Sequence, residues 1–172
     1  MYKYKHVTTV DADIDSTFKW FEHEGSFRRL MPPWEVAEEV RADETLDVGS
    51  QRVFRFPMGP LKMTWVAEHT AYNPPHHFAD KMVKGPFWHW THNHNLSEVD
   101  GKTEVIDDVT YQVPFGALGN LADTVLGGML VKSRLSRMFK ARELRLQRDL
   151  ERHSHFSHLP RKKILVLSLI HI

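Results

Sequence analysis

Residues 85–96 constrain the fold more than any other part of the chain, because they alternate like a β-strand yet place histidines on the apolar side. Successive side chains of a strand point to opposite faces. One face of this strand therefore carries Trp88, Trp90, His92, His94 and Leu96. Histidines on an apolar face need polar partners, so this face is typical of a cavity wall rather than of an ordinary core.

The residues after this strand predict a hairpin, since Asp100 and Gly101 form a pair that favours a two-residue turn. Counting outward from the turn, with Val99 opposite Lys102, fixes the register of the two strands. Asp107 then faces His94, and the same register sets Leu96 opposite Val105, His92 opposite Val109, Trp90 opposite Tyr111 and Trp88 opposite Val113. The aspartate and the histidine are expected to pair, because either one left unpaired in apolar surroundings would cost about 1 to 3 kcal/mol.

The composition indicates one globular domain with enough chain for a sizeable core, since 41% of the 172 residues are hydrophobic. The charge is balanced, with 23 basic against 22 acidic residues, and predicts no nucleic acid as a partner. The absence of cysteine excludes disulfides and thiolate metal sites. The first residues lack the apolar run of a signal peptide, and no apolar run approaches the roughly 20 residues that span a bilayer, so we expect a cytoplasmic protein.

Turn residues divide the remaining chain into strands framed by helices. Alternation predicts a first strand over 3–10, after which Asp13 or Asp15 caps a short helix and a second short helix occupies 26–31. Pro32 and Pro33 end that helix. Further strands are expected over 34–41, 51–56, 61–72, 77–83, 87–99 and 103–113. A long helix over 128–153 buries an apolar stripe formed by Val131, Leu135, Met138, Phe139, Leu146 and Leu150.

This order of elements resembles the helix-grip fold of the START-related superfamily, also called SRPBCC or polyketide cyclase-like domains. The resemblance is carried by Phe27 to Glu35, by Phe78-Ala79-Asp80, by Gly85-Pro86-Phe87 with Trp90, His92 and His94, and by Asp107 through Tyr111 to Pro114. These motifs look like the bacterial subgroup found alone or fused N-terminal to an NAD-dependent epimerase-like domain. The resemblance implies an α+β fold in which a curved antiparallel sheet of about seven strands, two short helices and a long C-terminal helix enclose a hydrophobic cavity.

The resemblance covers residues 1–156, which we expect to form a START-like ligand-binding domain. Residues 157–166 are interpreted as a linker and the start of a truncated dinucleotide-binding domain, because Arg161 to Val166 resembles the first strand of that domain in the fused relatives. A glycine-rich turn should follow such a strand. Residues 167–172 contain no glycine and are interpreted as a non-native tail.

The predicted function is binding of a hydrophobic or aromatic small molecule, such as a lipid, isoprenoid or polyketide-like compound. A mostly apolar pocket with a few convergent polar groups is typical of such sites. The candidate residues are Trp65, His69, Phe78, Asp80, Met82, Trp90, His92, His94, Asp107, Val109, Tyr111, Met138 and Phe139. A core with satisfied histidines is the alternative to a pocket. The proline-rich segment 31–34 and residues 114–119 are expected to form loops at the cavity mouth.

A catalytic alternative follows from the resemblance, because cyclase and dehydratase relatives use acids and bases in the cavity to move protons. His94 with Asp107 could be such a base. No serine or cysteine is placed as a nucleophile, which disfavours covalent acyl chemistry. A further alternative is an accessory domain of a fused epimerase-like oxidoreductase. The sequence favours a ligand-binding domain over an enzyme by itself.

A metal site is a weaker alternative, in which His92 and His94, two apart on one strand, reach an ion with His69 or an aspartate as a third ligand. Pairing with Asp107 explains these histidines more simply, so neither a metal nor a cofactor is predicted. The long helix carries a basic face formed by Lys132, Arg134, Arg137, Lys140, Arg142, Arg145, Arg148 and Arg152. A solvated face with local pairs to Glu143 or Asp149 is favoured over weak contact with an anionic membrane surface or an acidic partner.

Overall fold

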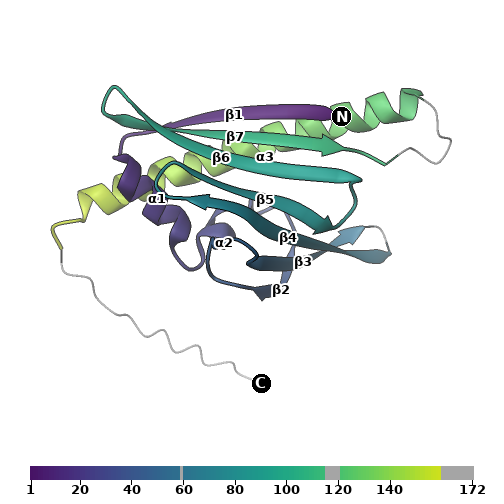
Figure 1. Ribbon diagram of the computed structural model, residues 1–172, viewed down its shortest axis with the longest axis horizontal. Helices are drawn as coiled ribbons and strands as arrows, with labels where there is room; N and C mark the ends of the chain where they lie inside the picture. The colour runs from purple at the N-terminus through teal and green to yellow at the C-terminus, as the bar shows by residue number, and fades with distance from the viewer. Residues whose placement is uncertain (59, 115–120, 160–172) are drawn as a thin grey trace, which may run out of the picture.

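A seven-stranded antiparallel sheet and one long helix dominate the fold in the computed structural model, which describes residues 1–58, 60–114 and 121–159. The elements are β1 (Tyr2–Val10), α1 (Ile14–Glu22), α2 (Ser26–Leu30), β2 (Glu38–Ala42), β3 (Gln51–Met58), β4 (Leu61–Asn73), β5 (His77–Lys84), β6 (His89–Val99), β7 (Lys102–Gln112) and α3 (Leu121–His155). The strand order is β1-β7-β6-β5-β4-β3-β2. Figure 1 shows α3 running across one face of this sheet, with α1 and α2 at one end. This is the α+β helix-grip arrangement that the sequence predicts.

The hairpin between β6 and β7 has the predicted register. Asp100 and Gly101 both have positive φ angles, 52° and 75°, as a two-residue hairpin turn of this type requires. His94 pairs with Asp107 across the two strands. The turn and the alternation together bring the histidines and the aspartate to one face of the sheet.

Two predictions at the ends of strands are wrong. The β6–β7 ladder ends one pair short of Trp88 and Val113, and the Trp88 side chain is 61% exposed, so it does not belong to the cavity wall. Residues 34–37 are expected to belong to a strand, but they lie outside the sheet, because β2 begins only at Glu38. There the amide of Glu35 donates to the carbonyl oxygen of Pro32 at 3.0 Å, which turns the chain directly after the prolines.

The helices form where capping and apolar spacing predict them. Asp13 caps α1, since its carboxylate accepts a hydrogen bond from the amide of Ser16 at 2.7 Å. α2 is held against α3 by Arg29, whose Nε donates to Asp149 Oδ2 at 3.0 Å. The sequence predicts that Asp149 and Glu143 pair with neighbouring arginines of the same helix, and this is wrong. Asp149 contacts Arg29 of α2, and Glu143 lies 3.1 Å from His6 Nε2 of β1. α3 begins at residue 121 rather than at 128.

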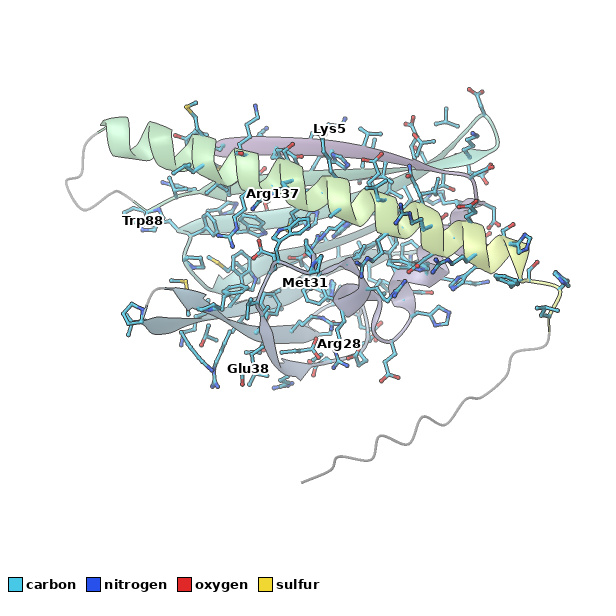
Figure 2. All side chains as sticks on the ribbon, turned by 180° about the vertical axis from the view of Figure 1, so that it is seen from behind. Lys5, Arg28, Met31, Glu38, Trp88 and Arg137 are labelled. Atoms are coloured by element: carbon cyan, nitrogen blue, oxygen red, sulfur yellow. The ribbon has the colours of Figure 1, made fainter. Side chains whose placement is uncertain are left out.

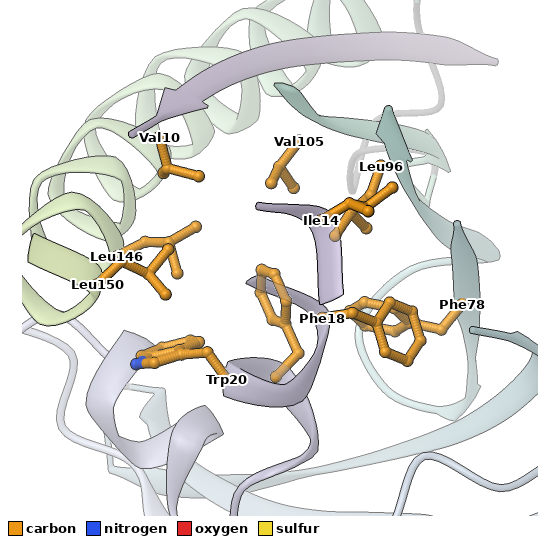
Figure 3. Packing of buried hydrophobic residues seen from close by; sticks show 10 residues of the cluster. Val10, Ile14, Phe18, Trp20, Phe78, Leu96, Val105, Leu146 and Leu150 are labelled. Atoms are coloured by element: carbon orange, nitrogen blue, oxygen red, sulfur yellow. The ribbon is translucent and has the colours of Figure 1, made fainter. Parts of the chain in front are cut away.

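Two hydrophobic clusters pack part of the space between the sheet and the helices. The first, called the α1 core, consists of Val10, Ile14, Phe18, Trp20, Phe21, Phe78, Leu96, Val105, Leu146 and Leu150 (Figure 3). The second, called the Tyr111 core, consists of Tyr4, Val109, Tyr111, Leu135 and Phe139. The predicted stripe of α3 contributes to both, so its apolar face is used along most of its length.

The predicted linker and tail fall mostly outside the described residues. α3 continues to His155, and the structural description ends at Leu159. Residues 160–172, which hold the expected dinucleotide-binding strand, lie outside the part of the chain that the structure describes. Among the described helices, none combines the length and the apolar character needed to cross a bilayer.

Candidate functional site

A cavity of about 450 Å³ lies between the sheet and α3, with α2 and the segment after it in its wall. Its volume falls in the range of small-molecule sites, roughly 300 to 1,000 Å³. Most of its lining is apolar or aromatic, with Phe27, Phe54, Trp65, Phe87, Trp90 and Phe139 as the large contributors. Figure 2 shows α3 from the cavity-covering side, where Met31 lies below the middle of the helix. The fold therefore builds an apolar cavity under α3.

Aromatic rings hold one another in place at one end of the cavity. The rings of Trp65 and Trp90 meet edge to face with their centroids 5.1 Å apart, and Phe87 lies 4.9 Å from Trp90. Phe54 stacks on Trp65 at 6.2 Å. Such arrangements stabilise aromatic pairs beyond simple burial and fix the orientation of the rings. This end of the cavity is a firm apolar surface.

A layer of polar side chains separates the two hydrophobic cores. On β7, Asp107 lies between Val105 of the α1 core and Val109 of the Tyr111 core. On α3, Arg142 lies between Leu146 and Phe139, which belong to the same two cores. The register of neighbouring strands places further polar residues beside Asp107. His94 lies directly opposite Asp107, His92 lies opposite Asp80, and Asp80 lies opposite His69. We call His69, Asp80, His92, His94, Asp107 and Arg142 the polar layer.

Asp107 lies at the back of this layer and contacts both central histidines. His92 Nε2 lies 3.0 Å from Asp107 Oδ1 in a buried hydrogen bond. His94 Nδ1 lies 2.7 Å from the same oxygen, as in an ion pair, but the contact lacks the alignment of a hydrogen bond. His94 also stacks on Phe78, with centroids 4.0 Å apart and planes 12° from parallel. The predicted pair of His94 and Asp107 is therefore confirmed, and His92 joins it.

Asp80 approaches the same two histidines from the cavity side. Its Oδ2 lies 3.7 Å from His92 Nδ1 and 3.8 Å from His94 Nε2. Each imidazole ring is thus placed between two carboxylates, with one nitrogen toward Asp107 and the other toward Asp80. The nitrogens toward Asp80 belong to rings that line the cavity, so a bound molecule could reach them.

The electrostatics of the layer separate the two central histidines. Burial lowers the pKa of His92, and the neighbouring His94 lowers it further, so that the attraction of Asp107 does not restore it. Burial also acts to lower the pKa of His94, but Asp107 and Asp80 together raise it above its ordinary value. Burial acts to raise the pKa of Asp107, yet its contacts with His92 and His94 lower it. The layer therefore favours a protonated His94 beside a neutral His92.

Three buried nitrogens in the described part of the chain have no hydrogen-bond partner, and all belong to residues that line the cavity. They are His69 Nδ1, His94 Nδ1 and Arg142 Nε. Burial lowers the pKa of His69 and also that of Arg142. The guanidinium carbon of Arg142 lies 5.4 Å from the centroid of the Phe139 ring. Unsatisfied buried polar groups are uncommon in proteins, so their location around one cavity, on β4, β6 and α3, points to this cavity as a binding site.

The structure brings most of the predicted site residues together. Nine of them line the cavity: Trp65, His69, Phe78, Asp80, Trp90, His92, His94, Met138 and Phe139. Asp107 supports the histidines from behind and is not part of the lining. Val109 and Tyr111 are not part of the lining either, because both are packed in the Tyr111 core at 1% exposure. Met82 is half-buried and also lies outside the lining, because its side chain lies over Gly85.

Sequence reasoning missed several lining residues. Charge pattern alone predicts Arg142 on the outer basic face of the helix, which is wrong because this residue lines the cavity. Its position three residues after Phe139 and four before Leu146 continues the apolar stripe, which was the available signal. Arg52 and Glu35 also line the cavity, and no local pattern indicated them. The predicted mouth loop is present in part, since Met31 belongs to the lining, whereas residues 115–119 lie outside the described residues.

Asp80, His92 and His94 also have the spacing of a metal-ligand set. One ligand atom from each lies within 4.8 Å of the others. His69, the third ligand expected from the sequence, is not part of this set. His92 Nε2 and His94 Nδ1 contact Asp107 and not the position that an ion would take between the other ring nitrogens and Asp80. These contacts with Asp107 would therefore be the same with and without an ion.

The arrangement can bind and orient a polar group and can move a proton. An apolar cavity with imidazoles, carboxylates and a guanidinium at one level holds the polar end of a molecule there and its apolar body against the aromatic end. His94, placed between two carboxylates, could accept or donate a proton at the cavity surface.

Solved structures with the same fold are similar to this chain at low identity. A nucleoside-diphosphate sugar epimerase from Corynebacterium glutamicum matches with a TM-score of 0.69 and 24% identity over 92% of this chain, which spans only 31% of that protein. The ZhuI aromatase/cyclase from Streptomyces matches with a TM-score of 0.64 and 15% identity, covering 89% of this chain and 95% of that one. Protein Ms6760 from Mycobacterium smegmatis matches with a TM-score of 0.61 and 17% identity, covering 87% and 91%.

No protein-family model matches the chain, and no curated protein sequence matches it. The likeness to solved structures at these identities shows a shared helix-grip, polyketide cyclase-like fold.

Proposed function

We propose that this chain binds a hydrophobic or aromatic small molecule in the cavity beneath α3. The observation that carries the proposal is an apolar cavity of about 450 Å³ whose wall also holds the unpartnered polar nitrogens of the described residues. The apolar body of the ligand would be held by burial against Trp65 and Trp90. His92 and His94 would orient its polar end, with Asp107 fixing both rings.

A cavity-blocking variant tests this proposal. Ala67 lines the cavity from β4, so Ala67→Phe should fill it, whereas Thr70→Phe places the same ring on an exposed position of the same strand. The neutral fluorescent probe N-phenylnaphthylamine should bind the unmodified protein and T70F, but not A67F. Circular dichroism would verify that A67F is folded. Equal binding by A67F and T70F would contradict a site in this cavity.

Native mass spectrometry of the protein from cells would identify a retained ligand. A bound organic molecule that dissociates only when the protein is denatured would support the proposed binding function. A metal-sized increment would instead make Asp80, His92 and His94 metal ligands.

A cyclase-like or dehydratase-like activity is a second candidate, favoured by the placement of His94 between Asp80 and Asp107 in the cavity wall. Exchange of the α-protons of acetylnaphthalene for deuterium would report such a base. The protein should accelerate this exchange, and His94→Gln should abolish the acceleration while N-phenylnaphthylamine still binds. A rate equal to that of buffer alone would rule against this activity for ketones of this kind.

An accessory role beside an epimerase-like domain is supported by the match to about a third of the Corynebacterium epimerase. Sequencing the source locus past residue 159 tests it. An open reading frame with a glycine-rich turn after residue 166 would support the role, and a stop codon directly after residue 172 would contradict it.

A further inference from the structure

The arginines of the cavity wall differ in their partners. Arg52 Nη1 lies 3.2 Å from Glu39 Oε2, and Arg134 Nη2 lies 2.8 Å from Glu35 Oε2. Arg142 has no such partner, because no carboxylate oxygen of the described residues lies within 4.0 Å of its guanidinium. Its Nε is buried and has no hydrogen bond. Two of these three cations thus form direct ion pairs within the described residues, whereas Arg142 does not.

The surroundings of Arg142 define what could neutralise it. The guanidinium stands beside the Phe139 ring on α3, one helical turn from Leu146, so apolar side chains flank it along the helix. A guanidinium donates hydrogen bonds and accepts none, so its missing partner must supply oxygen acceptors. Its planar fork matches a carboxylate, which can accept two parallel hydrogen bonds.

The charge of the polar layer limits the partner further. Asp80 and Asp107 already bring two negative charges to this layer. Their attraction for Arg142 does not outweigh the cost of burying its guanidinium, so the pKa of Arg142 stays lowered. A singly charged group adds the least negative charge to this layer, so a carboxylate fits better than a dianionic phosphate. The aromatic end of the cavity is formed by the rings of Trp65, Phe87 and Trp90, which offer mainly apolar contact.

We propose that the ligand is an amphipathic monocarboxylic acid whose carboxylate pairs with Arg142 while its apolar body fills the aromatic end of the cavity. This inference rests on the proposed binding function and names the class of ligand. His69, whose Nδ1 also has no hydrogen-bond partner, lines the same cavity from β4. Arg142 is then a binding residue rather than part of an outer basic face.

Matched pairs of acids and alcohols test the inference. Decanoate is compared with decanol, and naphthoate with naphthylmethanol, at about pH 7, where the acids are ionised. Displacement of N-phenylnaphthylamine and titration calorimetry give the affinities. The unmodified protein should prefer the acid over the alcohol by roughly 10-fold or more in at least one pair, as expected for a charge-assisted hydrogen bond.

Arg142→Gln should abolish this preference while alcohols and N-phenylnaphthylamine still bind, and Arg142→Met provides a second, apolar replacement if the first variant is unstable. Arg148→Gln, an exposed arginine on the same helix, should keep the preference. Equal affinity for acid and alcohol in the unmodified protein, or a preference that survives in R142Q and R142M, overturns the inference but leaves the binding function intact. Binding of none of the five compounds by either method overturns both.

Discussion

Asp107 supports the polar layer from inside the protein, so replacing it with asparagine should destabilise the fold strongly. The side chain keeps its size but loses the charge that His92 Nε2 and His94 Nδ1 contact at 3.0 and 2.7 Å. Removing one partner of a buried ion pair costs about 3 to 5 kcal/mol, because the other charge stays buried and uncompensated. Domains of this size have a free energy of unfolding of about 5 to 15 kcal/mol, so D107N should lose a large fraction of it.

The loss should also depend on pH, with a maximum in a definite window. The folded pKa of His94 is raised above its ordinary 6.5, so its contribution is full below pH 6.5 and is lost as the pH rises through the raised value. The folded pKa of Asp107 is lowered from 3.8, so its contribution is present above pH 3.8 and is lost as the pH falls. Asp80 on β5, His69 on β4 and Arg142 on α3 face the same pair and remain in both proteins. The difference between the two proteins should therefore be largest between pH 3.8 and 6.5.

Urea unfolding followed by circular dichroism across this pH range measures the effect. Asp108→Asn is the matched control, because Asp108 is the next residue of β7, on its opposite face. D108N should change the free energy of unfolding by no more than about 0.5 kcal/mol. A loss of less than about 1 kcal/mol in D107N, or a loss that stays constant with pH, would refute the buried ion pair.

Three further changes have expected outcomes that thermal or urea unfolding can measure. Arg29→Gln leaves the buried carboxylate of Asp149 without its partner and should cost about 1 to 2 kcal/mol, less than a fully buried pair because the guanidinium is half exposed. A Tm equal to that of R148Q, which changes an exposed arginine of α3, would contradict this role. Gly128→Ala would drive a methyl group into the Tyr2 ring and should lower the Tm. Adding Tyr2→Ala should recover part of this loss, whereas a double variant that loses the sum of the two single-variant losses would argue against the clash. Phe18→Ala removes a ring that is 2% exposed in the α1 core and should cost about 3 to 5 kcal/mol, whereas a loss below about 1 kcal/mol would mean that this core is loosely packed.

The sequence predicted the fold well wherever local rules were sufficient. The Asp100-Gly101 turn has only a few compatible geometries, so it fixed the register of β6 and β7 and placed His94 beside Asp107. The apolar stripe of α3 predicted the helix face that covers the sheet. Residues 34–37 failed as a strand because alternation there competes with the turn imposed by the two prolines, and the turn prevails.

The polar partners of the site could not be predicted, because they are joined by tertiary contacts. Arg29 of α2 meets Asp149 across 120 residues, and Arg52 of β3 meets Glu39 of β2 beside the cavity. Arg142 shares its residue type with its solvent-exposed neighbours, and only its helical phase distinguishes it. Charge alone therefore suggested an outer basic face, whereas the phase of the stripe places Arg142 inside.

The polar layer is a costly way to join the α1 core to the Tyr111 core. Apolar side chains at its positions would make one continuous core, and replacing buried charged groups by apolar ones is often neutral or stabilising by about 1 to 4 kcal/mol. Arg142 is the sharpest case, since its Nε has no partner to lose. Arg142→Met should therefore leave the free energy of unfolding unchanged or raise it, while abolishing the preference for carboxylic acids. A structural role for Arg142 predicts the opposite sign, a loss of stability of about 1 kcal/mol or more, so urea unfolding of this one variant separates an arginine kept for ligand binding from one kept for the fold.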